Sequence, residues 1–211
     1  MEKNISKPIG ACLLTGLFIC LSFCTWGQNA DISILRSINL HRNKSLDGFM
    51  AGISASVYPV AAAVPVTELI MGYTKHDKHL INYGWQTIAG LGINYVASFG
   101  IKYAVNRPRP YATYTYIENY RFNKDPSFPS GHTSFAFNTA TSLVLLCPEW
   151  YVAVPAYGWA AAVGYSRMHL GMHYPTDVIA GAITGAGASW LAYKGNKWLQ
   201  KRKNKTTTGG H

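Results

Sequence analysis

Residues 80–101 read LINYGWQTIAGLGINYVASFGI, a run without a single Asp, Glu, Lys or Arg. A helix needs ~20 predominantly apolar residues to cross the hydrocarbon core of a bilayer, and this run is long enough. Residues 48–73 form a second such run, in which Glu68 is the one charged side chain. Both runs predict helices that span a membrane.

Three shorter uncharged runs follow, at residues 133–146, 151–165 and 178–193. A helix-breaking turn, CPEW at 147–150, separates the first two, and the last is rich in the small residues that suit close helix packing. No stretch alternates like a strand. The sequence therefore predicts an all-α fold, a transmembrane bundle of five to six helices. The same runs also suit the core of a soluble helical protein, so length alone leaves both open.

The charged residues are few and unevenly placed. They make up 13% of the chain, against about a quarter in soluble domains. The net charge of +10 is concentrated in a C-terminal cluster of Lys194, Lys197, Lys201, Arg202, Lys203 and Lys205. Cations beside an apolar run are typical of a cytoplasmic anchor. We therefore expect residues 196–211 to be a basic cytoplasmic tail, and we expect no nucleic-acid partner.

The N-terminus resembles a secretory signal. Lys3 and Lys7 precede an apolar run at residues 8–23, and residues 24–28 form a candidate cleavage zone. Residues 1–28 are predicted to be a signal peptide or an uncleaved anchor, which leaves residues 29–195 as one folded domain.

The distribution of loop cations predicts an orientation. If residues 102–110 lie outside the cytoplasm, then the KHDKH loop at 75–79, the turn at 147–150 and the basic tail all lie inside. That arrangement agrees with the positive-inside rule and with an exported N-terminus.

Three short segments hold side chains suited to binding phosphate. The first runs from Lys102 to Arg109-Pro110, where prolines end a helix. The second is PSGH at residues 129–132, in which Ser130 is placed to cap a helix and Gly131 lets the backbone approach an anion. The third contains Ser166-Arg167, His173 and Asp177.

A metal site is the competing interpretation of the histidines. His169 and His173 are four residues apart, which suits two ligands on one helix, but Pro175 interrupts the helix and no matching acidic or cysteine set is present. We therefore expect no metal and no other cofactor.

Together the three segments resemble the signature motifs of the type 2 phosphatidic acid phosphatase family, which also includes acid phosphatases and vanadium haloperoxidases. The family pattern is Lys, six residues, Arg-Pro; then Pro-Ser-Gly-His; then Ser-Arg, five residues, His, three residues, Asp. All three occur here in order, and the resemblance covers roughly residues 80–193. The resemblance implies that residues 29–195 form a phosphatase domain.

The resemblance implies a role for each motif residue. His173 is expected to attack phosphorus and form a phosphohistidine, with Asp177 holding its tautomer. His132 is expected to protonate the leaving alkoxide and then to activate water. The phosphate oxygens are expected to be held by Lys102, Arg109, Ser130, Gly131 and Arg167. Arg107 is an extra cation beside the first motif; it either contacts substrate or lies in the lipid headgroup region, and we favour the latter.

The implied substrate is a lipid phosphate at the periplasmic side of a bacterial inner membrane. Phosphatidylglycerol phosphate, undecaprenyl pyrophosphate and lipid A phosphate are substrates within the family. Five aromatic residues between the first two motifs, Tyr111 to Phe122, suit a membrane interface or ordinary loop packing equally. A soluble periplasmic acid phosphatase and a non-enzymatic membrane binding protein are the alternatives.

Overall fold

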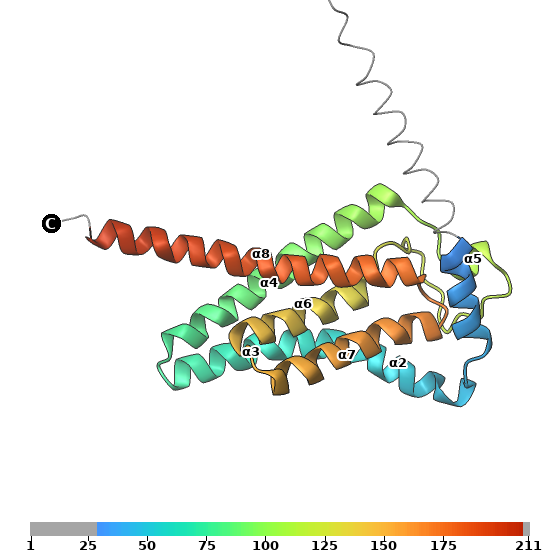
Figure 1. Ribbon diagram of the computed structural model, residues 1–211, viewed down its shortest axis with the longest axis horizontal. Coiled ribbons are helices and arrows are strands. Elements are labelled where there is room, and N and C mark those ends of the chain that lie inside the picture. The colour runs from blue at the N-terminus through green and yellow to red at the C-terminus, as the bar shows by residue number, and fades with distance from the viewer. Residues whose placement is uncertain (1–28, 209–211) are drawn as a thin grey trace, which may run out of the picture.

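The computed structural model describes residues 29–208, with side chains placed as far as Arg202. Within that range it is a bundle of helices without strands (Figure 1), so the predicted all-α class is confirmed. The signal peptide or anchor predicted for residues 1–28 lies outside the described residues.

The helices follow one another with short connections. A first helix covers residues 29–40. After it come η1 (Lys44–Leu46), α2 (Asp47–Ala55), α3 (Val57–Thr74), α4 (Lys78–Val105), α5 (Pro110–Thr113), α6 (Gly131–Leu146), α7 (Trp150–His169) and α8 (Pro175–Thr208). The run at 48–73, expected to be one helix, is divided between α2 and α3 at Ser56.

Local chemistry sets the limits of α4, the helix that contains the uncharged run at 80–101. Asp77 caps its start by accepting hydrogen bonds from the backbone N–H groups of His79 and Leu80, at 2.9 and 3.2 Å. Asn106 ends it in the left-handed conformation, with φ of 47°. Two prolines follow within four residues and prevent the helix from continuing. The first motif therefore begins in the last turn of α4 and ends beyond it.

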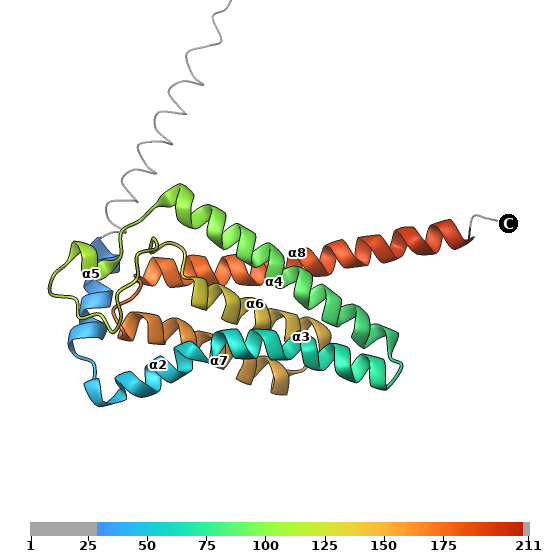
Figure 2. The same cartoon turned by 180° about the vertical axis from the view of Figure 1, so that it is seen from behind.

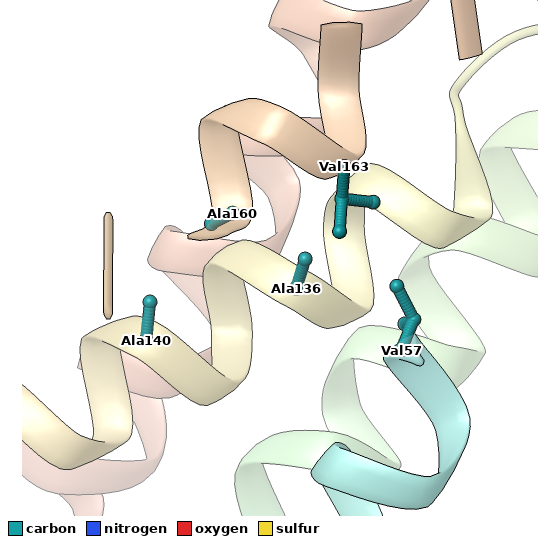
Figure 3. Close-up of a cluster of buried hydrophobic side chains, with 5 residues drawn as sticks. All are labelled: Val57, Ala136, Ala140, Ala160 and Val163. Atoms are coloured by element: carbon teal, nitrogen blue, oxygen red, sulfur yellow. The ribbon is translucent and has the colours of Figure 1, made fainter. Parts of the chain in front are cut away.

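α6 lies at the centre and packs against α3, α4, α7 and α8. Figure 3 shows the small apolar cluster that joins it to α3 and α7, made of Val57, Ala136, Ala140, Ala160 and Val163. α8 approaches α6 so closely that a Cβ at Gly185 would lie 2.0 Å from the Ser134 carbonyl oxygen. Small residues thus let the backbones of these helices pack tightly.

The interior is polar and the outer surface apolar. Asn94, Asn138 and Ser134 are fully buried, whereas Val96 is 70% and Ile183 68% exposed. Two helical segments, Lys44–Thr74 and Lys78–Thr113, are long and apolar enough to cross a membrane, and 22% of the most apolar window of each is buried. An apolar exterior around small polar side chains is the arrangement of helices that face lipid.

The two ends of the bundle differ. Figures 1 and 2 show α5 and the long loop before α6 at one end, together with the start of α8 and the first helix. The α3–α4 turn and the α6–α7 turn lie at the other end, beyond which α8 extends. All three motifs therefore meet at one end, opposite the basic residues of the tail.

Candidate active site

A cavity of about 210 Å³ at the motif end brings predicted residues from all three motifs together. Its lining includes Lys102, Arg109, Gly131, His132, Arg167 and His173. Asp177 and Ser130 are fully buried behind this surface. Helix ends and loops supply every one of these side chains, because α4, α6, α7 and α8 all begin or end here.

His173 is fixed in one tautomer by its neighbours. Its Nε2 lies 3.3 Å from Arg109 Nη1. Because a guanidinium has donors and no acceptor, Nε2 accepts this hydrogen bond and the ring proton is on Nδ1. Burial lowers the pKa of His173 to about 3, with Arg109 and Arg167 acting in the same direction and Asp177 opposing them. The ring is therefore neutral at neutral pH, with its Nε2 lone pair facing the buried cations of the cavity.

Asp177 and Ser127 face the other nitrogen of this ring. His173 Nδ1 is 3.4 Å from Asp177 Oδ2 and 3.3 Å from Ser127 Oγ. The Ser127 hydroxyl donates to Asp177 Oδ2, which also accepts from the backbone N–H of Tyr174 at 2.9 Å. Asp177 is thus positioned to orient His173, and Ser127 is an additional partner that the sequence did not suggest.

His132 occupies the second position of α6, where the ring is less buried than His173. Its edge contacts the Tyr58 ring of α3, with centroids 5.0 Å apart. The side chain lines both the first cavity and a second one of about 340 Å³, which it shares with Arg167. The two cavities therefore adjoin at His132 and Arg167.

Lys102 and Arg109 meet at the carboxylate of Asp125. Lys102 Nζ is 3.0 Å from Asp125 Oδ2, and Arg109 Nη2 is 2.9 Å from Oδ1. Partial burial favours the neutral acid, but the charges of Arg109 and Lys102 outweigh it and lower the pKa of Asp125. A carboxylate of the loop before α6 therefore occupies donors that the motif assigns to phosphate.

Arg167 is a buried cation with unused donors. It lies in the last turn of α7, is 6% exposed, and donates from Nη1 to Ser54 Oγ at 2.7 Å. Its Nε has no hydrogen-bond partner among the described residues. Burying an unpaired guanidinium is unfavourable, so this side chain is suited to receive an anion in the cavity.

Gly131 and Ser130 differ in what surrounds them. A Cβ at Gly131 would meet no protein atom within 4 Å, so packing does not require this glycine and the space beside it is open to a ligand. Ser130 makes no side-chain cap, contrary to the expectation from its position. Its hydroxyl accepts from Thr133 Oγ1 at 2.9 Å, and its N–H donates to the Asp177 carbonyl at 2.9 Å. In this structure Ser130 ties α6 to α8.

The sequence led us to expect Arg107 in the headgroup region, but its side chain turns inward and binds two buried carboxylates. Its Nη1 donates to Asp177 Oδ1 at 2.8 Å and its Nη2 to Asp31 Oδ2 at 2.7 Å. The guanidinium also stacks on the Tyr174 ring at 3.8 Å. Arg107 thus joins the first helix to the carboxylate behind His173. No sequence signal marked Asp31 as its partner.

His169 and the loop aromatics were also singled out in the sequence. His169, weighed as a metal ligand, binds Asp47 at 2.9 Å outside the cavity. Across residues 29–202 no group of three or more His, Cys, Asp or Glu side chains is placed to share a metal ion.

Of the loop aromatics, Phe122 is 81% exposed, whereas the Tyr111 hydroxyl donates to the Asn123 carbonyl and accepts from the Asn123 N–H.

This arrangement defines a helical bundle with a cationic, histidine-containing cavity at one end. The family model of the PAP2 superfamily matches residues 83–201. The chain belongs to this superfamily, as the three motifs predicted.

Similar proteins agree with this membership. The chain is 30% identical over 154 residues to undecaprenyl-diphosphatase BcrC of Bacillus subtilis, covering 73% of this chain and 77% of that one. It is 38% identical over 88 residues to lipid A 4'-phosphatase of Bacteroides thetaiotaomicron, 42% of this chain and 39% of the relative.

Solved structures show the same fold. The crystal structure of Aquifex aeolicus LpxE matches with a TM-score of 0.65 at 25% identity, over 78% of this chain and 95% of that one. A transmembrane PAP2-type phosphatidylglycerolphosphate phosphatase from Bacillus subtilis matches with a TM-score of 0.67 at 23% identity, over 92% and 98%. The two apolar segments long enough to cross a bilayer, with their large apolar side chains exposed on the outside of the bundle, indicate a membrane protein.

Proposed function

We propose that the chain hydrolyses the terminal phosphate of a membrane-borne lipid, a monoester or a pyrophosphate, without a metal ion. One observation carries this proposal. The cavity lined by Lys102, Arg109 and His173 is also lined by Tyr95 and Phe99, which are 58% and 50% exposed on α4. A phosphate attached to a lipid can therefore reach the cations from the lipid-facing side of a membrane-spanning helix. Lipid A phosphate, undecaprenyl pyrophosphate and phosphatidylglycerol phosphate fit this description.

The first chemical step forms a phosphohistidine. The Nε2 lone pair of His173 attacks phosphorus, and a P–N bond forms while the P–O bond to the lipid breaks. Burial, followed by the charges of Arg167 and Arg109, lowers the pKa of His132 to about 3 in the free protein. His132 therefore takes up a proton as the phosphate anion binds beside it, and donates that proton to the departing oxygen. Arg109 and Arg167 stabilise the negative charge on the equatorial oxygens, and Asp177 stabilises the proton on Nδ1.

The second step releases inorganic phosphate. His132, now neutral, accepts a proton from a water molecule that attacks phosphorus from the vacated side. The P–N bond breaks, its electron pair returns to His173 Nε2, and both histidines regain their starting states. No redox change and no metal-bound species is involved.

Activity measurements on purified full-length protein test this proposal. Phosphate release from a long-chain lipid phosphate should continue in EDTA and should be inhibited by orthovanadate, which adopts the five-coordinate geometry of the transition state. The lipid should be a better substrate than a soluble phosphomonoester. Loss of activity in EDTA with recovery in Mg²⁺ would contradict the metal-independent mechanism. Equal turnover of both substrates by protein recovered without detergent would favour the soluble acid phosphatase instead.

We place the active site at the periplasmic face of a bacterial inner membrane. The α3–α4 turn, which contains Lys75 and Lys78, lies at the end of the bundle opposite the motifs, beyond which the basic end of α8 extends (Figure 1). These cations support a cytoplasmic location for that end. Alkaline phosphatase fused after Lys124 should be active, and the same reporter fused after Lys205 should be inactive. The reverse pattern would place the site in the cytoplasm.

A further inference from the structure

Asp125 occupies two of the cations that are expected to bind substrate. Its carboxylate oxygens are 3.0 Å from Lys102 Nζ and 2.9 Å from Arg109 Nη2. The two cationic side chains are 11% and 4% exposed, whereas the Asp125 side chain is 40% exposed and also lines the cavity. A ligand that enters must therefore compete with an anion already in place.

The loop that carries Asp125 is held independently of this carboxylate. Arg109 Nε donates to the Asp125 carbonyl at 2.9 Å, and Lys102 Nζ donates to the Pro126 carbonyl at 2.6 Å. The N–H of Ser127 donates to the Arg107 carbonyl at 2.7 Å. All three contacts are accepted by backbone carbonyls and do not need the Asp125 carboxylate. The carboxylate is therefore not required to anchor the loop, and its negative charge has another effect.

That effect is selection by charge. A terminal phosphate carries up to two negative charges on three free oxygens, and it can displace a single carboxylate from Lys102 and Arg109. A phosphodiester carries one charge on two free oxygens, so it displaces the carboxylate from these two cations much less readily. Most lipids of a membrane carry phosphodiesters, so an open site of three cations at the membrane surface would be exposed to a large excess of them.

We infer that Asp125 is a specificity-determining residue, which competes for Lys102 and Arg109 and so restricts the site to terminal phosphate groups, excluding phosphodiester headgroups. This inference rests on the proposed function, because it requires that the site binds the phosphate of a lipid. Where a site is available only part of the time, its apparent affinity falls by that fraction. Asp125 therefore lowers the affinity of the site for every anion by the same factor, and the anions that bind weakest, the phosphodiesters, are the first whose dissociation constant exceeds the concentration present.

The test compares wild-type protein with Asp125→Asn, which keeps the shape of the side chain and removes the charge. Glu118→Gln is the matched control, because Glu118 belongs to the same loop but pairs with Lys44 at 2.8 Å and Arg42 at 3.2 Å outside the cavity. Calorimetry measures orthovanadate binding. Hydrolysis of a lipid phosphate in mixed micelles is then measured with increasing phosphatidylglycerol, or with equal amounts of diacylglycerol to control for surface dilution.

Asp125→Asn should bind orthovanadate about tenfold more tightly than wild-type protein and should become sensitive to inhibition by phosphatidylglycerol. Wild-type protein and Glu118→Gln should resist that inhibition. Unchanged or weaker vanadate binding by Asp125→Asn, with no gain in sensitivity, would overturn the inference. Asp125→Ser provides a second variant, and failure of both to fold would make the ion pairs structural and would also overturn it.

The measurements distinguish an error in the proposed function from an error in the role of Asp125. If wild-type protein does not hydrolyse any lipid phosphate, then the proposed function is wrong, and vanadate binding still reports on Asp125. If wild-type protein is active and the Asp125 variants match it in both assays, then only the role of Asp125 is wrong.

Discussion

Arg107 Nη1 lies 2.8 Å from Asp177 Oδ1, on the side of that carboxylate away from His173. Both carboxylates that Arg107 binds are buried, with Asp177 0% and Asp31 1% exposed. Asp31 also accepts from the backbone N–H of Thr176 at 2.9 Å. The first helix, the first motif and the start of α8 are thereby joined behind the nucleophile.

Arg107→Lys should reduce kcat with little change in KM, because a lysine cannot bind both carboxylates with one planar group and Asp177 would no longer be held against His173. A misplacement of about 1 Å costs roughly 100-fold in rate, and we expect a loss of that order. Steady-state kinetics on a lipid phosphate measure both constants.

Asp31→Asn should show the same pattern more weakly, and the double variant should lose no more than Arg107→Lys alone, because the two residues act through one contact. Arg42→Lys is the control, since Arg42 is buried and pairs with Asp47 away from the cavity. A rise in KM with unchanged kcat would instead place Arg107 in contact with substrate.

His132→Ala should separate the two histidines. An alkyl leaving group needs a proton, whereas a stable phenolate does not, so kcat/KM should fall about 10²–10⁴-fold for an alkyl phosphate and much less for an activated aryl phosphate. The ratio kcat/KM is used because it reports the steps up to formation of the phosphohistidine. His173→Ala should remove activity on both substrates. Equal losses on the two substrates in His132→Ala would exclude the general-acid role.

Gly131→Ala and Gly185→Ala form a pair with opposite expectations. A methyl group at Gly131 meets open space, so thermal stability in detergent should be unchanged while orthovanadate binding weakens, roughly tenfold or more. At Gly185 the methyl group meets the backbone of Ser134, so stability should fall by roughly 1–3 kcal/mol. A Gly131→Ala protein that unfolds early but binds vanadate normally would make this glycine structural.

The arrangement of the fold was largely predictable from the sequence because its signals are local. The uncharged run at 80–101 lies inside α4, and the PSGH segment opens α6 as expected. The break between α2 and α3 at Ser56 was not predicted, because it interrupts the helix without changing the apolar pattern. Pro59 lies in the first turn of α3, where its missing N–H and its ring fit a helix start but interrupt a continuous helix, so a local signal does mark this boundary.

The sequence predicted which motif residues lie close together, but it did not predict their charged partners outside the motifs. Lys102, Arg167 and His173 line one cavity. Asp31 contacts Arg107 across 76 positions of sequence, and no local pattern joins the two. Asp125 precedes the PSGH segment by only a few residues, yet its pairing depends on the path of the loop back towards α4. Long-range contacts between charged groups are not specified by spacing.

Trapping of a phosphohistidine tests the central claim most directly. His132→Ala protein, mixed with an activated aryl phosphate carrying ³²P, should still phosphorylate His173 but should hydrolyse the intermediate slowly, because the base that activates water is absent. Acid-labile, base-stable label should therefore accumulate and map to His173 by mass spectrometry, and it should be absent from the double variant His132→Ala/His173→Ala. Turnover by wild-type protein without label on His173, or near wild-type activity in His173→Ala, would contradict the account.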